Sequence, residues 1–150
     1  MDKNVKNNYE TLIRQGIDSV NNRKFDSAES YFLNAIKLSK RKYQAYINLS
    51  NIYILQNKKN KCSELLINYL YKFNFNKHIA EHAGKLFFNF NFEKEIIELF
   101  KISNLHLKDY KKDKCYLFFI QGKYLEQNEE FNNAKLAYSN SIKCDKFLSI

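Results

Sequence analysis

Two histidines, His78 and His82, come closest in type and spacing to a metal site in this 150-residue chain. Residues four apart share a face of a helix, so both imidazoles could reach one transition-metal ion. Such a site needs a third ligand, but Glu81 lies off that face and His106 is distant in sequence. The sequence therefore predicts two half-exposed histidines and no bound metal.

Other catalytic signatures are missing from the sequence. It contains no glycine-rich phosphate loop, no Gly-x-Ser-x-Gly and no His-Glu-x-x-His. Gly122-Lys123 lacks the upstream glycine and the following hydroxyl residue of a P-loop. The acidic pairs Glu93/Glu95 and Glu129/Glu130 fall near predicted helix starts, where carboxylates oppose the helix dipole favourably. We therefore expect a protein that is not an enzyme and that has no cofactor.

Composition argues against several classes of partner. The net charge of +9 comes mainly from lysine, alongside abundant Asn, Ile, Phe and Tyr, a set that suggests AT-rich coding. No cluster of Arg, Asn or Gln is arranged to read bases, so nucleic acid is not the expected partner. No apolar run is long enough for a bilayer, and no secretory signal is visible, so we expect a cytoplasmic protein. The odd number and wide spacing of Cys62, Cys115 and Cys144 favour free thiols over disulfides or zinc.

Small residues recur along the chain with a fixed period. Gly16, Ser50 and Gly84 follow one another at an interval of about 34 residues. Gly122 follows Gly84 at this interval plus four residues. Glycine inside a helix costs about 1 kcal/mol relative to alanine, so glycines in one phase need a common packing reason.

The chain resembles the tetratricopeptide repeat family, whose unit is a helix–turn–helix of about 34 residues. The repeats would cover about 9–42, 43–76, 77–110 and 115–148, after a short polar lead at 1–8. The resemblance implies that each first-helix small residue meets a small residue twelve positions on. The structural positions that carry it are Gly16, Ala28, Phe32, Tyr46, Ser50, Tyr53, Cys62, Gly84, Gly122, Phe131, Ala134 and Tyr138.

The third repeat departs from the pattern. Phe92 arrives one residue early for the aromatic that precedes the second helix, and Glu95 stands where a small residue is expected. The four extra residues before the fourth repeat fall near Asp109 to Lys112, where we expect a shifted turn or a lengthened helix. The family's proline between repeats is absent throughout, so Asn, Asp and Lys must form the turns.

The expected architecture is an all-α, right-handed α-solenoid of about four helix–turn–helix hairpins in one domain. Residues 1–5 should be frayed. No proline interrupts the periodic segments, and Asn-rich joints separate them. The predicted helices cover about 6–21, 25–39, 43–56, 60–73, 77–89, 93–105, 112–127 and 131–145.

The family resemblance also implies a binding surface. First helices of tetratricopeptide arrays line a concave groove in which a peptide or protein segment docks, so we expect a non-catalytic protein–protein scaffold. Asparagine suits a peptide backbone because its amide both donates and accepts hydrogen bonds. At some of these positions the alternative is packing against a neighbouring hairpin. The expected groove residues are Ile13, Arg14, Ile17, Asn48, Asn51, His78, His82, Lys85, Phe119 and Lys123.

Narrower functions can be weighed against the same positions. A subfamily binds acidic chaperone tails through a two-carboxylate clamp, but of its required residues only Asn48 is matched here, so that function is not carried over. RNA binding by a helical repeat would need a regular code, which the inner positions lack. An alternative is the substrate-recognition arm of a larger enzyme, such as a glycosyl- or sulfotransferase.

The C-terminal hairpin should also make contacts. Phe147, Leu148 and Ile150 are apolar where a free terminus is usually polar. We expect either a further repeat or domain after them, or pairing with a second copy through the exposed face of 131–145, including Leu136.

Overall fold

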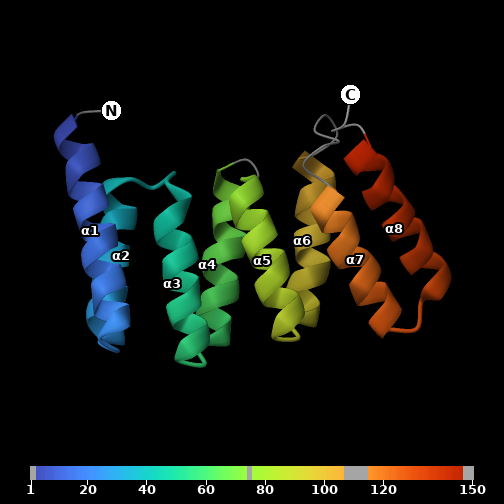
Figure 1. Ribbon diagram of the computed structural model, residues 1–150, viewed down its shortest axis with the longest axis horizontal. Coiled ribbons are helices and arrows are strands. Elements are labelled where there is room, and N and C mark those ends of the chain that lie inside the picture. The colour runs from blue at the N-terminus through green and yellow to red at the C-terminus, as the bar shows by residue number, and fades with distance from the viewer. Residues whose placement is uncertain (1–2, 74–75, 107–114, 147–150) are drawn as a thin grey trace. The chain divides into compact units, whose positions relative to one another are not determined.

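The computed structural model describes residues 3–73, 76–106 and 115–146. Within these ranges the chain is all-α, with eight helices and no strand (Figure 1). The predicted fold class is thus confirmed at the level of secondary structure. The helices are α1 (Lys3–Asn21), α2 (Phe25–Leu38), α3 (Tyr43–Leu55), α4 (Lys59–Lys72), α5 (Lys77–Asn89), α6 (Glu93–His106), α7 (Cys115–Gln127) and α8 (Phe131–Lys146).

The observed helix ends lie close to the predicted ones. The largest difference within the described residues is at the first helix, which begins at Lys3 instead of residue 6, so most of the lead expected to fray is helical. The predicted start of the seventh helix at 112, and the expected irregularity at Asp109 to Lys112, lie outside the described residues.

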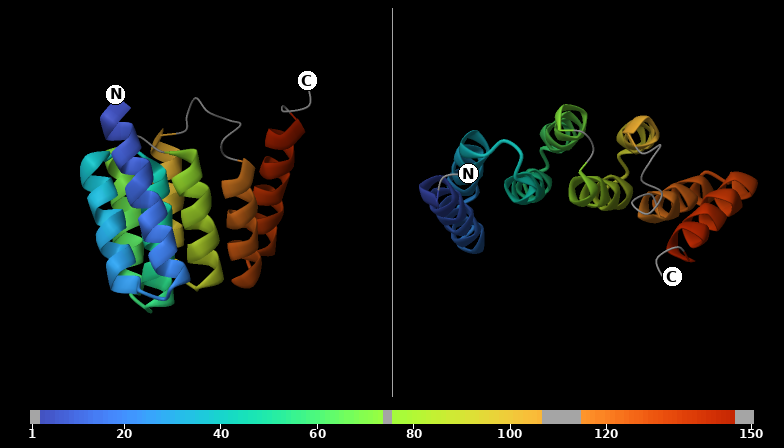
Figure 2. Two further views of the ribbon diagram at one scale, coloured as in Figure 1. Left: turned by 60° about the vertical axis from the view of Figure 1, so that its left-hand side comes forward. Right: turned by 90° about the horizontal axis from the view of Figure 1, so that it is seen from above.

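The chain divides into two compact units, Met1–Leu66 and Ile67–Ile150. The predicted single domain, 9–148, falls in both of them. In the first unit α2 packs against α1 and α3, and α1 also touches α3. In the second unit α5 packs against α6 and α7, and α7 runs beside α8 (Figure 2).

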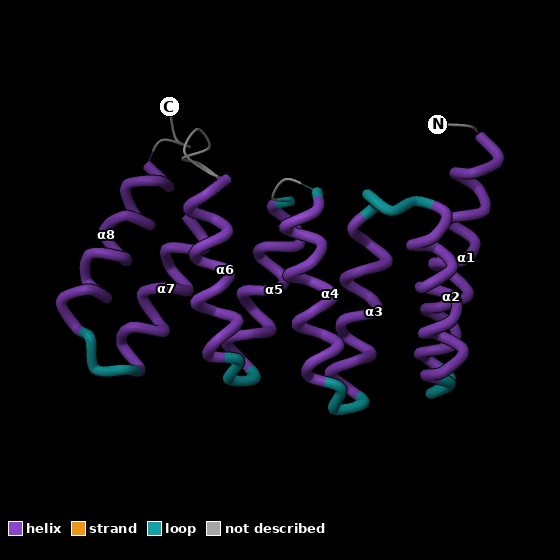
Figure 3. Tube along the Cα trace, turned by 180° about the vertical axis from the view of Figure 1, so that it is seen from behind, coloured by secondary structure: helices purple, strands orange, loops and turns teal. Residues whose placement is uncertain are grey.

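The four hairpin turns share one backbone conformation (Figure 3). In the turn between α1 and α2, Arg23 has φ 56°, its N–H bonds the carbonyl of Val20, and the next N–H, of Lys24, bonds the carbonyl of Ser19. This pair of bonds is the Schellman motif, which satisfies carbonyls left unpaired at a helix end. The left-handed residue of the other three turns is Asn57, Asn91 and Glu129.

These turns correct the alignment of the third hairpin. The carbonyl of the last turn residue accepts the first N–H bond of the next helix. The N–H of Ala28 thus bonds the carbonyl of Lys24, and the N–H of Ile96 bonds the carbonyl of Phe92. Ile96, rather than Glu95, therefore occupies the position of Ala28, and it is buried. Phe92 is not a misplaced helix-start residue. It belongs to the turn, and its ring stacks on Phe87 with centroids 5.3 Å apart, the hydrophobic contact that often accompanies this motif.

Two of the three glycines lie directly under aromatic rings. A Cβ added at Gly16 would meet ring atoms of Phe32 within 3 Å, and one at Gly122 would meet Tyr138 at 2.5 Å. The nearest neighbour is thus the aromatic sixteen residues on, not the small residue twelve residues on that we expected. Gly84 differs, because a Cβ there would make ordinary contacts of 3.6–3.8 Å.

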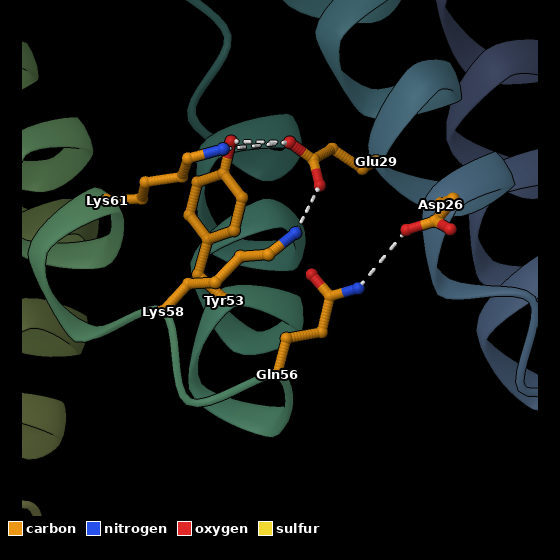
Figure 4. Close-up of polar contacts among 6 residues, drawn as sticks. All are labelled: Asp26, Glu29, Tyr53, Gln56, Lys58 and Lys61. Atoms are coloured by element: carbon orange, nitrogen blue, oxygen red, sulfur yellow. Dashed lines mark hydrogen bonds and ion pairs between the residues drawn. The ribbon is translucent and has the colours of Figure 1, made fainter.

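A polar cluster ties α2 to the turn between α3 and α4 (Figure 4). The carboxylate of Glu29 accepts hydrogen bonds from the Tyr53 hydroxyl at 3.1 Å and the Lys58 ammonium at 3.2 Å, and Lys61 lies 3.9 Å away. Burial, and then the charge and hydrogen bond of Glu29, raise the pKa of Tyr53 to about 12. The cluster therefore fixes the second hairpin against the first.

Two smaller expectations can be compared with these helices. Cys62 is a buried free thiol, as predicted, and Cys115 is a half-buried free thiol, whereas Cys144 lies outside the residues whose side chains are described. Among the described residues, no helix is both long enough and apolar enough to cross a membrane.

Candidate functional site

In the second unit, α5 places several of the expected groove residues on one side of the helix. The amide oxygen of Asn76 caps the helix by accepting from the N–H of Ile79 at 3.2 Å. The core side of α5 is buried and consists of Ile79, Ala80, Ala83, Gly84 and Phe87. On the opposite side of α5, Lys85 and His78 are exposed and His82 is half-buried.

α7 supplies the neighbouring part of this surface. Leu117, Ile120 and Gly122 are its buried residues. Tyr116 is half-buried, Phe119 is 41% exposed and Lys123 is exposed. Phe119 and Lys123 are among the expected groove residues.

The two helices interlock lysines with aromatic rings. The ammonium of Lys85, on α5, lies 5.4 Å from the ring centroid of Tyr116, on α7. The ammonium of Lys123, on α7, lies 5.5 Å from the ring of Phe88, on α5, and 5.3 Å from its own helix neighbour Phe119. Such cation–π contacts contribute about 0.5–1 kcal/mol each at exposed sites. We call these five residues the lysine–aromatic face.

Two ionisable side chains at this face have shifted pKa values. Burial, and then the charge of Lys85, lower the pKa of His82 from 6.5 to about 4, so its imidazole is neutral at pH 7. Burial, and then the carboxylate of Glu81, raise the pKa of Tyr116. Among described residues, no Asp or Glu oxygen lies within 4.0 Å of the ammonium of Lys85 or Lys123. The two cations are therefore held by rings and not by acids.

In the first unit, one of the expected groove residues is used for packing. Ile13 is half-buried and packs on the core cluster of Tyr9, Ala35 and Ala45. In the same cluster the Tyr9 hydroxyl accepts a hydrogen bond from the Ala45 N–H at 3.2 Å, which joins α1 to the start of α3. For Ile13, the alternative of packing against a neighbouring hairpin is therefore what the structure shows.

The other expected residues of the first unit are available to solvent. Arg14 and Asn51 are exposed, Ile17 is 42% exposed and Asn48 is half-buried. They stand on α1 and α3, two helices that contact each other. This surface is neutral and amide-bearing except for Arg14, and so differs in chemistry from the lysine–aromatic face.

One member of the lysine–aromatic face was missed by sequence reasoning. Phe88 was not among the expected groove residues, although it follows Lys85 by three positions and so shares its side of α5. That spacing was a usable signal.

The histidine pair does not develop into a metal site in the part of the chain that the structure describes. No group of three His, Cys, Asp or Glu side chains there could hold a metal ion. His78 and His82 are instead a surface residue and a partly desolvated one.

Comparisons with protein-family models and with curated proteins found no match.

Proposed function

We propose that this chain is a non-catalytic scaffold of the tetratricopeptide type, a right-handed solenoid of four hairpins that binds a segment of another protein in the cytoplasm. The hairpin turns support this proposal. Their left-handed residues Arg23, Asn57 and Asn91 follow one another at the family's interval of about 34 residues, and Glu129 follows four residues later than that interval. The glycines beneath Phe32 and Tyr138 add a second periodic feature.

The lysine–aromatic face is the observation that carries the binding role. Lys85 and Lys123 occupy the same position of successive hairpins, on the two helices α5 and α7 that pack against each other. A lysine side chain loses about 2 kcal/mol of rotamer entropy when fully ordered, and the rings beneath these two already restrict them. The face fits an extended segment that places two carboxylates beside an apolar side chain.

The amide-bearing surface of the first unit suits the backbone of an extended segment. Asn48 and Asn51 each offer one acceptor and two donors, which match the carbonyls and N–H groups of an extended backbone. Ile17 offers apolar contact area beside them. Under this proposal, the amides of the first unit bind backbone groups, whereas the lysine–aromatic face, taken by itself, selects for acidic side chains.

The experiment is a binding measurement with paired charge reversals. A partner recovered with the purified chain as bait, and identified by mass spectrometry, is titrated against wild type and against Lys85→Glu/Lys123→Glu. We expect the affinity of the double variant to fall at least tenfold, because two attractive contacts become repulsive. Unchanged affinity would mean that the partner uses another surface.

A matched control separates the face from overall charge. Lys37→Glu/Lys94→Glu makes the same change in net charge at two exposed positions on α2 and α6. It should bind like wild type at physiological ionic strength, where exposed charges beyond about 8 Å are screened. If both double variants weaken binding equally, then long-range charge, and not the face, accounts for the affinity.

A further inference from the structure

The α7–α8 hairpin carries an apolar patch that lies outside the lysine–aromatic face except for Phe119. The rings of Phe119 and Tyr138 have centroids 6.0 Å apart. Ile142 follows Tyr138 by four residues and so lies one turn further along the same side of α8. Ile142 is 58% exposed, a large value for an isoleucine side chain. We call these three residues the end patch.

The matching residues of the first hairpin are covered. When the left-handed turn residues Arg23 and Glu129 are aligned, Phe119, Tyr138 and Ile142 correspond to Ile13, Phe32 and Ile36. Phe32 is fully buried, and Ile13 and Ile36 both pack on the cluster that contains Ala45 of α3. In the first unit, then, this side of a hairpin receives another helix.

The charge at the rim of the end patch is the reverse of that in the first hairpin. In the same alignment Lys135 takes the place of Glu29, which accepts from Tyr53 and Lys58 on the covering hairpin. Lys135 is exposed and carries no described contact. The carboxylate of Glu126, on α7, already accepts a 2.7 Å hydrogen bond from the Tyr138 hydroxyl. A helix docking here would therefore meet an ammonium where the first hairpin offers a carboxylate.

We propose that the end patch binds an amphipathic helix of a different protein, one with an apolar stripe that is flanked by acidic residues. The helix would cover Phe119, Tyr138 and Ile142 much as α3 covers their counterparts, and would place a carboxylate against Lys135. Removing the exposed apolar area of Ile142 from water favours binding of a helix that covers it.

A second copy of the chain fits this patch poorly. Each copy has a net charge of +9, so like charges oppose self-association, and Lys135 would need an acid that the patch itself does not offer. The outer side of α1 is also unsuited to stack on it. Leu49 and Tyr53 of α3 are buried, but the residues at the corresponding positions of α1 are Gln15 and Ser19. The Ser19 hydroxyl donates to the Gln15 carbonyl of its own helix.

Two synthetic helices test the proposal. Both are fluorescein-labelled, stapled peptides of 16 residues, the length of α8, with leucine at every third or fourth position. One carries glutamate on both flanks of the leucine stripe and the other carries lysine. Fluorescence anisotropy with the full chain should show saturable binding of the glutamate helix and at least tenfold weaker binding of the lysine helix.

Variants locate the binding. Ile142→Asp should abolish binding of the glutamate helix, and Lys135→Glu should reverse the preference between the two helices. Leu55→Asp changes an equally exposed apolar residue in the first unit and should bind like wild type. Far-UV circular dichroism melts check that each variant is folded, and the milder Ile142→Ser replaces any variant that is not.

Three results would overturn the proposal. The glutamate helix could fail to saturate with folded wild type, or it could bind folded Ile142→Asp normally. Alternatively, sedimentation could show a wild-type dimer that Ile142→Asp dissociates, which would give the patch to a second copy. Because Lys85 and Lys123 are unchanged in these variants, failure here leaves the binding role of the lysine–aromatic face to its own test.

Discussion

Replacing Gly16 with alanine should destabilise the first unit, although alanine is the better helix former. The new methyl group would lie within 3 Å of the Phe32 ring, which is fully buried, so the ring or the backbone must shift. Overpacking of this kind costs about 1–3 kcal/mol. The helix-propensity gain of about 1 kcal/mol offsets part of this, so we expect a net loss of about 1 kcal/mol.

Gly84→Ala is the matched reference, because the same propensity gain applies without the crowding. Its methyl group would make ordinary contacts with Leu99, Tyr116 and Ile120. This variant should be as stable as wild type or more stable by up to about 1 kcal/mol. The free energy of unfolding would be measured by urea titration, with hydrogen exchange reporting each unit separately, since repeat arrays can depart from two-state behaviour.

A double-mutant cycle tests the cause. In a Phe32→Leu background the ring is gone, so Gly16→Ala should become neutral or stabilising, which corresponds to a coupling energy of about 1–3 kcal/mol. If Gly16→Ala and Gly84→Ala shift stability equally in the wild-type background, then the glycine–ring contact does not explain the glycine period, and the packing argument fails.

Three further outcomes are expected. Gly122→Ala should also destabilise, but less than Gly16→Ala, because Tyr138 is half-buried and its ring can move; urea melts would show the order. Glu29→Gln should lower stability by about 1–3 kcal/mol in thermal melts, since it weakens the charged bonds from Tyr53 and Lys58, and an unchanged melt would show that the cluster is incidental. The lowered pKa of His82 means that its stabilising contribution is present above pH 6.5 and is lost as the pH falls toward 4. Stability measured over that range should therefore fall less steeply in His82→Asn, and an identical pH profile would contradict the assignment.

Most of the helical pattern could be predicted because its signals are local. The absence of proline and the Asn-rich joints both act within one or two turns, and the observed ends of α2 to α6 agree with them closely. The third hairpin was misaligned at Phe92 because the sequence does not reveal that Asn91 adopts a left-handed conformation. Once that backbone angle is known, Phe92 belongs to the turn and Ile96 to the core.

The candidate site was predicted as a set of positions but not as a set of contacts. The repeat phase assigned Lys85 and Lys123 to a binding groove, and both side chains are exposed in the structure, while their use in binding stays a prediction. The pairing of Lys85 with Tyr116 depends on how α5 and α7 pack, which no spacing within either helix specifies. Ile13 was placed in the groove for a similar reason, because the sequence did not show that Ala45 would pack against it.

The hairpin turns have a consequence for how such a chain can change over time. The same left-handed backbone is adopted by an arginine, two asparagines and a glutamate, none of which is the glycine that this conformation usually favours. Main-chain hydrogen bonds, and not one permitted residue type, define each corner. A hairpin can therefore be duplicated, lost or exchanged without carrying a special corner residue with it. Replacing Arg23 or Glu129 with glycine would relieve the small conformational cost that each of the four turns now carries.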